Sequence, residues 1–307
     1  MRSVKESLKV IFLGTSGGIP TAERNLPAIA LKVSREIILF DCAEGTQRQM
    51  EKAKLSIGKI NKIFITHLHG DHIMGIPGIL QTLSLQNREK PLHIFGPKGT
   101  TDFINAIKTT VEFTLTFEVY IKEITEEIIF EAGDYFIKCV RTEHTNKSFA
   151  FAFIEKDRPG KFHPEKARAL QIPMGPLWKK LQYWETITLP DGRIVEPSEV
   201  VEPPRPGRKI VYSGDTPPCV SVIKLSKGAT LLIHESTYGE DLEDKALETK
   251  HSTTIQAAKV AREAGVEKLV LTHISSRYSN LNELLEQAQK IFLNTKVAED
   301  LMEIVLN

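Results

Sequence analysis

Long apolar runs, cysteine pairs and an excess of one charge are all missing from this sequence of 307 residues. Lys and Arg number 40 and Asp and Glu 39, so a net charge of +1 gives no global electrostatic footprint for nucleic acid, and any RNA-binding surface must be local. No apolar run approaches the ~18 residues of a membrane span, and residues 1–7 lack the apolar segment of a signal peptide. We therefore expect a soluble cytoplasmic protein that does not bind membranes.

The three cysteines exclude a disulfide framework. Cys42, Cys139 and Cys219 are far apart, odd in number and outside any Cys-x-x-Cys pair. Buried, inert thiols in a reducing compartment are the expected state, and only Cys219, near Asp215, is of interest. The length allows one large α/β domain or two smaller ones with a sizeable core.

Histidine and aspartate are concentrated in one short stretch, His67-Leu68-His69-Gly70-Asp71-His72, directly after the apolar run 62–65. Imidazole and carboxylate are zinc ligands, and residues i and i+2 of an extended segment point the same way, so His67 and His69 can share one ion. Asp71 and His72 follow the bend at Gly70 and could hold a second ion. Chance clustering of surface polar residues is the weaker explanation.

Further candidate ligands follow other strand-like runs. The runs 135–141, 209–212, 230–233 and 268–271 precede His144, Asp215, His234 and His273. Because ligands bind outside the carboxyl ends of strands in α/β sheets, these side chains can converge with His67 on one site. With His251, which precedes an amphipathic helix at 254–264, six of the nine histidines (67, 69, 72, 144, 251 and 273) would then lie at one place.

The rest of the chain alternates between the two kinds of element. We expect strands at 9–13, 28–33, 37–41, 92–95, 117–124 and 149–154, and helices at 46–54, 74–85 and 101–111. The turn 14–20 is rich in glycine, so its amides could meet a phosphate, although an ordinary tight turn explains it equally well. His93 lies inside an expected strand and is expected to be structural.

The composition changes between about residues 155 and 207. Prolines gather, the β-periodicity fades, and basic residues cluster at Lys156, Arg158, Lys161, Lys166, Arg168, Lys179 and Lys180. We interpret 155–207 as an arm that interrupts a single domain of residues 1–307. An ordinary linker is the alternative, but it does not need the apolar residues Phe162, Leu170, Leu177, Trp178 and Leu181. His163 is expected to be solvated.

The pattern His-x-His-x-Asp-His after a strand resembles the metallo-β-lactamase superfamily, and other motifs resemble the ribonuclease Z family within it. These motifs are Phe12-Leu13-Gly14-Thr15 with Pro20, residues 40–46, His234-Glu235-Ser236-Thr237, His251-Ser252-Thr253, residues 272–278, and 172–177 in the arm. They span nearly the full chain, and Ser236 stands where alanine is common. The resemblance implies an α/β fold, an αββα sandwich of two mixed β-sheets flanked by helices, with a flexible tRNA-binding arm inserted.

The resemblance also implies roles for the site residues. His67, His69 and His144 would hold one zinc ion, Asp71, His72 and His273 the other, and Asp215 would bridge the two ions of each subunit. An aspartate oxygen that bridges the two ions suits a phosphate substrate better than the cysteine thiolate that some lactamases have at this position. Asp71 is the expected general base, His251 the expected acid for the leaving 3′-oxygen, and Glu235 would orient His251.

The implied activity is that of an endoribonuclease. It would remove the 3′ trailer of precursor tRNA by metal-activated attack of water, leaving a tRNA 3′-hydroxyl and a trailer with a 5′-phosphate. Gly175, Pro176, Lys179 and Lys180 of the arm are expected to contact tRNA, and Arg277 either meets a substrate phosphate or pairs with a core carboxylate. A homodimer is expected, since the arm could then reach a tRNA held by the partner subunit. The alternatives are another hydrolase of the superfamily, acting on small molecules, and a non-catalytic RNA-binding scaffold.

Overall fold

The computed structural model describes residues 8–125, 127–157 and 159–306. Two compact units divide these residues: the larger takes those up to Glu131, Ile137–Phe153 and those from Lys209 onwards, and the smaller takes Ala132–Phe136 and Ile154–Arg208. Arg158 and the N-terminal residues 1–7, on which two of the sequence predictions fall, lie outside the described residues. Among the described residues, no helix is long and apolar enough to cross a membrane.

The larger unit contains a first sheet of seven strands, in the order β18-β1-β3-β4-β5-β6-β7. These strands are β1 (Leu8–Gly14), β3 (Ala28–Val33), β4 (Glu36–Phe40), β5 (Ile60–Phe64), β6 (Leu92–Gly96), β7 (Val119–Glu123) and β18 (Glu303–Leu306). The pairs of β1 with β18 and β3, and of β3 with β4, are antiparallel, whereas β4 to β7 run parallel. The parallel strands therefore end at a common edge.

A second sheet of seven strands has the order β17-β15-β14-β13-β10-β9-β8. Its strands are β8 (Glu127–Glu131), β9 (Tyr135–Arg141), β10 (Phe149–Glu155), β13 (Lys209–Tyr212), β14 (Leu231–Glu235), β15 (Leu269–Thr272) and β17 (Thr295–Val297). From β13 to β17 the strands are parallel. Strand β8 was not predicted from the sequence, whereas β9 has the predicted bounds.

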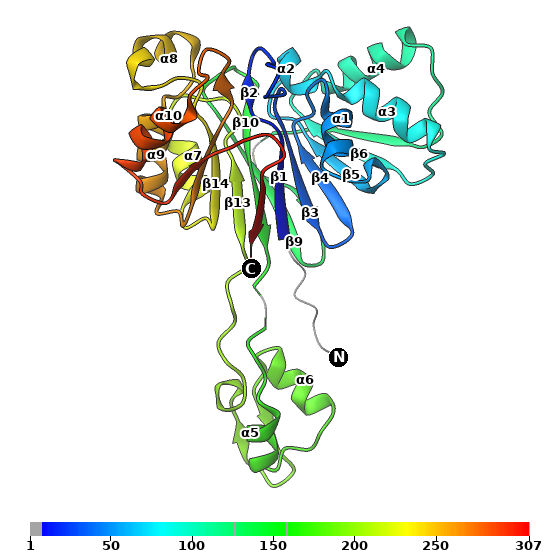
Figure 1. Cartoon of the computed structure of the whole chain (residues 1–307). Coiled ribbons are helices and arrows are strands. Elements are labelled where there is room, and N and C mark those ends of the chain that lie inside the picture. Colours follow the sequence, from blue (N-terminus) through cyan, green and yellow to red (C-terminus); the bar gives the residue numbers. More distant parts are fainter. Residues whose placement is uncertain (1–7, 126, 158, 307) are drawn as a thin grey trace. The chain divides into compact units, whose positions relative to one another are not determined.

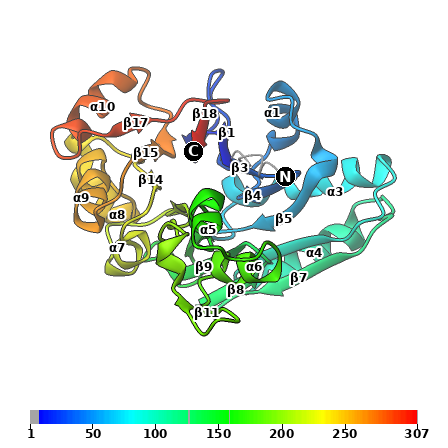
Figure 2. The same ribbon diagram turned by 90° about the horizontal axis from the view of Figure 1, so that it is seen from below.

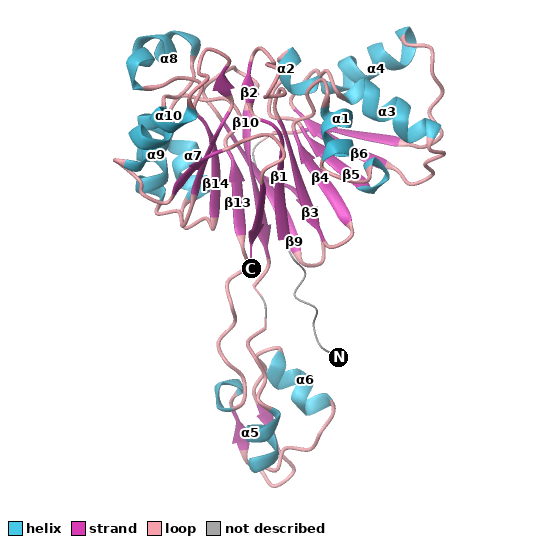
Figure 3. Cartoon of the chain, viewed as in Figure 1, coloured by secondary structure: helices cyan, strands magenta, loops and turns pink. Residues whose placement is uncertain are grey.

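Aromatic side chains join the two sheets. The ring of Phe40 lies 5.9 Å from that of Phe151 and 6.3 Å from that of Tyr212, and the rings of Phe64 and Phe151 are 5.6 Å apart. All four side chains are fully or almost fully buried, as expected where two sheets pack face to face. Figure 3 shows the strands of both sheets side by side with helices on the outside.

Helices cover the outer faces of this sandwich (Figures 1 and 2). On the first sheet lie α1 (Thr46–Lys52), α3 (Ile76–Leu85) and α4 (Thr100–Thr110), and on the second α7 (Val220–Ser226), α9 (Thr254–Ala264) and α10 (Leu281–Gln289), with α8 (Glu243–Thr249) beyond them. Helix α9 begins with a capping box between Thr253 and Gln256 and ends at Gly265 in the left-handed conformation. The predicted αββα architecture is therefore confirmed.

The smaller unit has a core of its own. It contains α5 (Pro164–Ala169), α6 (Pro176–Gln182) and a hairpin of β11 (Ile187–Thr188) and β12 (Ile194–Val195). Its apolar cluster is built from Ala167, Ile172, Leu181, Ile187, Leu189, Val195, Val200 and Val201, with Phe162, Leu170, Leu177 and Trp178 packed against it. The apolar residues that a linker would not need therefore form a folded core.

His163, which was expected to be solvated, is partly exposed and also has two carboxylate partners. Its Nδ1 lies 2.8 Å from Glu165 Oε1 and its Nε2 3.0 Å from Glu202 Oε1. The second partner is distant in sequence and becomes a neighbour only through the fold.

Candidate metal centre

Seven ligand-type side chains meet at the ends of strands β5, β9, β13 and β15, in the larger unit. They are His67, His69, Asp71, His72, His144, Asp215 and His273, of which Asp71 and His72 lie in the short helix α2 (Gly70–Ile73). Their ligand atoms form overlapping groups of three, and within each group the atoms lie within 4.8 Å of one another. The structure thus brings the whole predicted set together, and its role as a ligand set stays a prediction.

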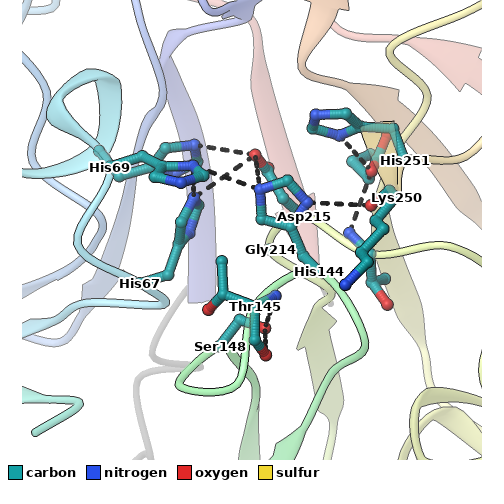
Figure 4. Close-up of polar contacts among 12 residues, drawn as sticks. His67, His69, His144, Thr145, Ser148, Gly214, Asp215, Lys250 and His251 are labelled. Atoms are coloured by element: carbon teal, nitrogen blue, oxygen red, sulfur yellow. Dashed lines mark hydrogen bonds and ion pairs between the residues drawn. The ribbon is translucent and has the colours of Figure 1, made fainter. Parts of the chain in front are cut away.

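Asp215 lies at the centre of these groups. Its Oδ2 is 3.6 Å from the Nε2 of His67, 3.3 Å from that of His72, 3.9 Å from that of His144 and 3.3 Å from that of His273. A carboxylate so placed can bridge two ions. Figure 4 shows His67 and His69, from one segment, and His144, from another, converging on Asp215.

His69 and Asp71 each complete one group of three ligand-type side chains. His69 Nδ1 lies 3.0 Å from the Nε2 of His67 and 3.2 Å from that of His144. On the other side, Asp71 Oδ2 lies 3.7 Å from the Nε2 of His72 and 3.6 Å from that of His273. The two groups correspond to the two predicted zinc sets.

Hydrogen bonds at the outer nitrogens fix the orientation of the histidine rings. His67 Nδ1 lies 3.0 Å from Thr66 Oγ1, and His72 Nδ1 lies 2.7 Å from Asp41 Oδ2. His144 Nδ1 lies 2.9 Å from the Lys250 carbonyl, and His273 Nδ1 lies 2.9 Å from Thr237 Oγ1. Such outer partners are typical of metal-binding histidines, because they leave Nε2 for the ion.

Asp41 is a supporting residue that sequence reasoning did not single out. This buried carboxylate accepts hydrogen bonds from the Thr66 amide and hydroxyl and from the hydroxyl of Tyr212, and it contacts His72. It has a left-handed φ of 57°, a strained conformation that its four contacts can hold. Its position directly after strand β4, the rule that found the ligands, could have identified it.

Three buried polar atoms show that these residues fit a cation. Among the described residues, His72 Nε2, His273 Nε2 and Asp215 Oδ1 have no hydrogen-bond partner. Leaving a buried polar atom unpaired costs about 1–3 kcal/mol, and a bound cation would remove this cost. The mixed imidazole and carboxylate donor set is that of zinc and similar ions, so the site indicates metal binding.

The local electrostatics keep the bridging carboxylate ionised. Burial raises the pKa of Asp215, but the charges of His273 and His72, both 3.3 Å away, outweigh it, so the pKa lies well below its usual value. Burial holds the pKa of His67 well below its usual value, and its neighbours His72 and His144 contribute to this. A neutral imidazole beside an ionised carboxylate is the state that binds a metal.

A second cluster, of Glu235 and His251, lies beside the first. Glu235 Oε1 is 2.8 Å from His251 Nδ1, and the buried carboxylate also accepts the amides of Thr216 and Thr237. Burial lowers the pKa of His251, but the charge and hydrogen bond of Glu235 outweigh it and raise the pKa to about 9. The ring lies 5.4 Å from that of His273. A cationic imidazole is thus held next to the ligand groups.

These side chains open onto a cleft of about 660 Å³. It is lined by His69, Asp71, His144, Asp215, His251 and His273 together with Gly17, Gly18, Ile19, Thr237, Tyr238, Thr249, Ser275, Ser276 and Arg277. The glycine turn forms part of its wall, and the Gly18 amide donates to Asp71 Oδ2 at 3.0 Å. A Cβ on Gly17 would lie 2.6 Å from His273 Nδ1, so close approach to that ring requires glycine here.

Other predicted residues lie elsewhere. His234, expected to converge on the site, is in none of the ligand groups among the described residues, and its Nδ1 lies 2.7 Å from the Glu235 carbonyl. Cys219 is buried, with Sγ 3.5 Å from Thr216 Oγ1. The predicted tRNA contacts Gly175, Pro176, Lys179 and Lys180 are exposed residues of the smaller unit, at and within α6.

Comparisons with known proteins agree with this geometry. A family model described as "Anti-Pycsar protein Apyc1" matches residues 8–159, and one described as "Beta-lactamase superfamily domain" matches residues 198–274. Ribonuclease Z of Methanothermobacter thermautotrophicus is 48% identical over 97% of this chain and 96% of its own, and that of Methanosarcina acetivorans 45% identical over 97% of both. The solved structure of human tRNase Z, short form, is 32% identical, covers 96% of this chain and 98% of its own, and has a TM-score of 0.72. The chain belongs to the ribonuclease Z family of the metallo-β-lactamase superfamily.

Proposed function

We propose that this chain is a zinc-dependent endoribonuclease that removes the 3′ trailer of precursor tRNA, leaving a tRNA 3′-hydroxyl and a trailer with a 5′-phosphate. The observation that carries the proposal is one cleft that holds both the carboxylate-centred histidine groups and a cationic imidazole. Relatives named ribonuclease Z cover nearly the whole chain, which supports the same reaction.

The proposed cofactor is two zinc ions per subunit. His67, His69 and His144 would hold one, Asp71, His72 and His273 the other, and Asp215 would contact both; the unpaired buried atoms of three of these residues support the assignment. When bound, such ions lower the pKa of a coordinated water toward ~7 and neutralise charge on phosphoryl oxygens.

Asp71 is the proposed general base. Burial raises its pKa, but the close approach of His273 and the charges of His72 and His273 lower it by more, so the pKa lies below its usual value and the carboxylate is ionised at neutral pH. It lines the cleft, and the Gly18 amide fixes Oδ2. Asp71 can therefore accept a proton from the attacking water.

His251 is the proposed general acid, and Glu235 its positioning residue. The leaving ribose 3′-oxygen is a poor leaving group unless it is protonated. Because Nδ1 is engaged by Glu235, Nε2 is the nitrogen that can donate, and a pKa of about 9 keeps the ring charged at neutral pH. Proton transfer of this kind contributes about 10²–10⁴-fold to the rate.

Arg277 is proposed to contact a substrate phosphate. Its guanidinium lies 5.3 Å over the ring of Tyr238, its Nε donates to Ser275 Oγ at 3.0 Å, and it lines the cleft. It makes no ion pair in the part of the chain that the structure describes, which favours the phosphate over the alternative of a core carboxylate partner.

Residues 155–207 are proposed to be the tRNA-binding arm of an otherwise single domain, with contacts from Gly175, Pro176, Lys179 and Lys180. Their exposure and the folded core of this unit support the proposal. Double-stranded RNA is recognised mostly through shape and phosphates, which exposed lysines suit. We further propose a cytoplasmic homodimer, in which the arm serves the partner subunit's tRNA.

A comparison of two substrates, each with and without a chelator, tests the proposal. Precursor tRNA should be cut once, at the start of the trailer, and chelation should abolish this activity together with hydrolysis of bis(p-nitrophenyl) phosphate. Hydrolysis of the small ester without cleavage of precursor tRNA would indicate a small-molecule hydrolase. Cleavage that survives complete metal removal would contradict the role of the seven ligands.

A further inference from the structure

Arg24 is a buried cation whose donors are used by main-chain carbonyls. The residue is only 8% exposed. Its Nη2 donates to the Tyr278 carbonyl at 2.8 Å and to the Ser275 carbonyl at 3.3 Å, and its Nη1 to the Ile274 carbonyl at 3.4 Å. Within the described residues it has no carboxylate partner at ion-pair distance. A buried charge is retained at a cost, so these carbonyl contacts require an explanation.

Two of these carbonyls, those of Ser275 and Tyr278, belong to a tight turn that carries Arg277. The Tyr278 amide donates to the Ser275 carbonyl at 3.1 Å, which closes a four-residue turn with Arg277 as its third residue. Arg24 contacts the first and the last carbonyl of this turn. At the far end of the Tyr278 side chain, the hydroxyl accepts a hydrogen bond from the Gly239 amide at 2.8 Å.

We propose that Arg24 is a positioning residue: by holding both ends of the turn 275–278, it presents the Arg277 guanidinium to the cleft, where Arg277 binds a phosphate of the RNA substrate. This inference rests on the proposed function for the identity of the phosphate. Arg24 itself is not among the residues that line the cleft, and three of its hydrogen bonds go to main-chain carbonyls, so it acts through the turn and not on the substrate.

An arginine suits this role better than a lysine. The planar guanidinium presents five N–H donors in a fixed fork, so one side chain can bind three carbonyls at once, whereas a lysine ammonium is a compact point donor on a flexible stem. Arg24 is itself held by a turn, because Thr21 Oγ1 accepts the amides of Glu23 and Arg24, and the Thr21 amide donates to the Arg24 carbonyl.

Replacement of Arg24 by lysine tests the proposal through a split between KM and kcat. Arg24→Lys keeps the charge but loses the fork, so Arg277 becomes mobile and KM for precursor tRNA should rise about 5–10-fold, while kcat stays within about 2-fold and metal content is unchanged. The matched control is Arg262→Lys, on the exposed face of α9, which should change neither constant.

A double-mutant cycle with Arg277→Ala separates positioning from general support of the fold. Loss of a charge-assisted contact with phosphate should raise KM about 10-fold or more in Arg277→Ala. In that background, Arg24→Lys should raise KM by less than about 2-fold, because the residue it positions is gone. Equal effects of Arg24→Lys in the two backgrounds, or a fall in kcat with loss of metal, would overturn the proposal.

Thr21→Val provides a second route if Arg24→Lys does not fold. It loosens the turn that carries Arg24 and leaves the guanidinium in place, so a smaller rise of KM, about 3-fold, should again vanish in Arg277→Ala. A wild-type protein that fails to cut precursor tRNA would overturn the proposed function alone. The same cycle would then be measured with bis(p-nitrophenyl) phosphate, where additive effects of Arg24 and Arg277 would overturn the inference about Arg24.

Discussion

Replacement of Glu235 by glutamine should cause a defect that depends strongly on pH. The buried carboxylate lies 2.8 Å from His251 Nδ1, and glutamine keeps its shape while it removes the charge. The protonated form of His251, the proposed acid, prevails below its pKa and is lost as the pH rises through that value. In the wild type this loss occurs near pH 9. In the variant it should occur at pH 6.5 or lower, because burial, the largest influence, lowers the pKa by more than the charge of Asp215 raises it.

The size of the defect follows from the two pKa values. The rise from 6.5 to about 9 corresponds to a preference of about 3 kcal/mol for the charged ring. At pH 8 about 90% of His251 is protonated when its pKa is 9 and about 3% when it is 6.5, so cleavage should fall about 30-fold. At pH 6 both proteins keep most of their imidazolium, and the difference should be less than about 2-fold.

Single-turnover cleavage of precursor tRNA between pH 6 and 9 measures this difference. Glu248→Gln, which removes an exposed carboxylate on α8, is the matched control and should follow the wild-type profile. Metal content and melting temperature should be recorded for each variant, since the glutamine amide must face backbone amides that the carboxylate accepted. A loss of activity equal at pH 6 and pH 8 would refute the assignment of Glu235 as the group that keeps His251 charged.

Three further predictions concern the acid, the arm and the glycine turn. His251→Ala should cut turnover about 10²-fold or more while the metal content stays intact, and unchanged turnover would remove His251 from the mechanism. Deletion of residues 156–205 with a short glycine linker should weaken binding of precursor tRNA and flatten its salt dependence, yet spare hydrolysis of bis(p-nitrophenyl) phosphate; loss of both activities would make these residues part of the core. Gly17→Ala should displace the His273 ring, since the new Cβ would lie 2.6 Å from Nδ1, and metal affinity should fall about 10–100-fold. Gly18→Ala is the control: a Cβ there has open space around it and adds only the strain of a positive φ, so this variant should retain metal.

The positions of the ligands could be predicted because parallel strands end at a common edge. His67, His144, Asp215 and His273 each follow an apolar run in the sequence, and the sheets bring these ends together. The same rule failed for His234, which is the fourth residue of strand β14 and not its end. Alternation along that strand gives Glu235, the next residue, the opposite direction, and Glu235 is the one that contacts His251.

Features that depend on distant partners could not be predicted. The support of His72 by Asp41 and Tyr212 joins residues far apart in the sequence, and the same is true of the contact between His163 and Glu202. The helix expected at 74–85 begins only at Ile76, because Met74 ends the short helix α2 and the Gly75 amide donates to the distant Cys42 carbonyl at 2.9 Å. Pro77, in the first turn of α3, was a local sign of this later start.

Anomalous diffraction from crystals of the purified protein, recorded on both sides of the zinc absorption edge, tests the central claim most directly. Two peaks roughly 3.5–4 Å apart are predicted, one among His67, His69 and His144 and the other among Asp71, His72 and His273, with Asp215 between them. Crystals of protein that still cuts precursor tRNA but show no metal peak within reach of Asp215 would contradict the account.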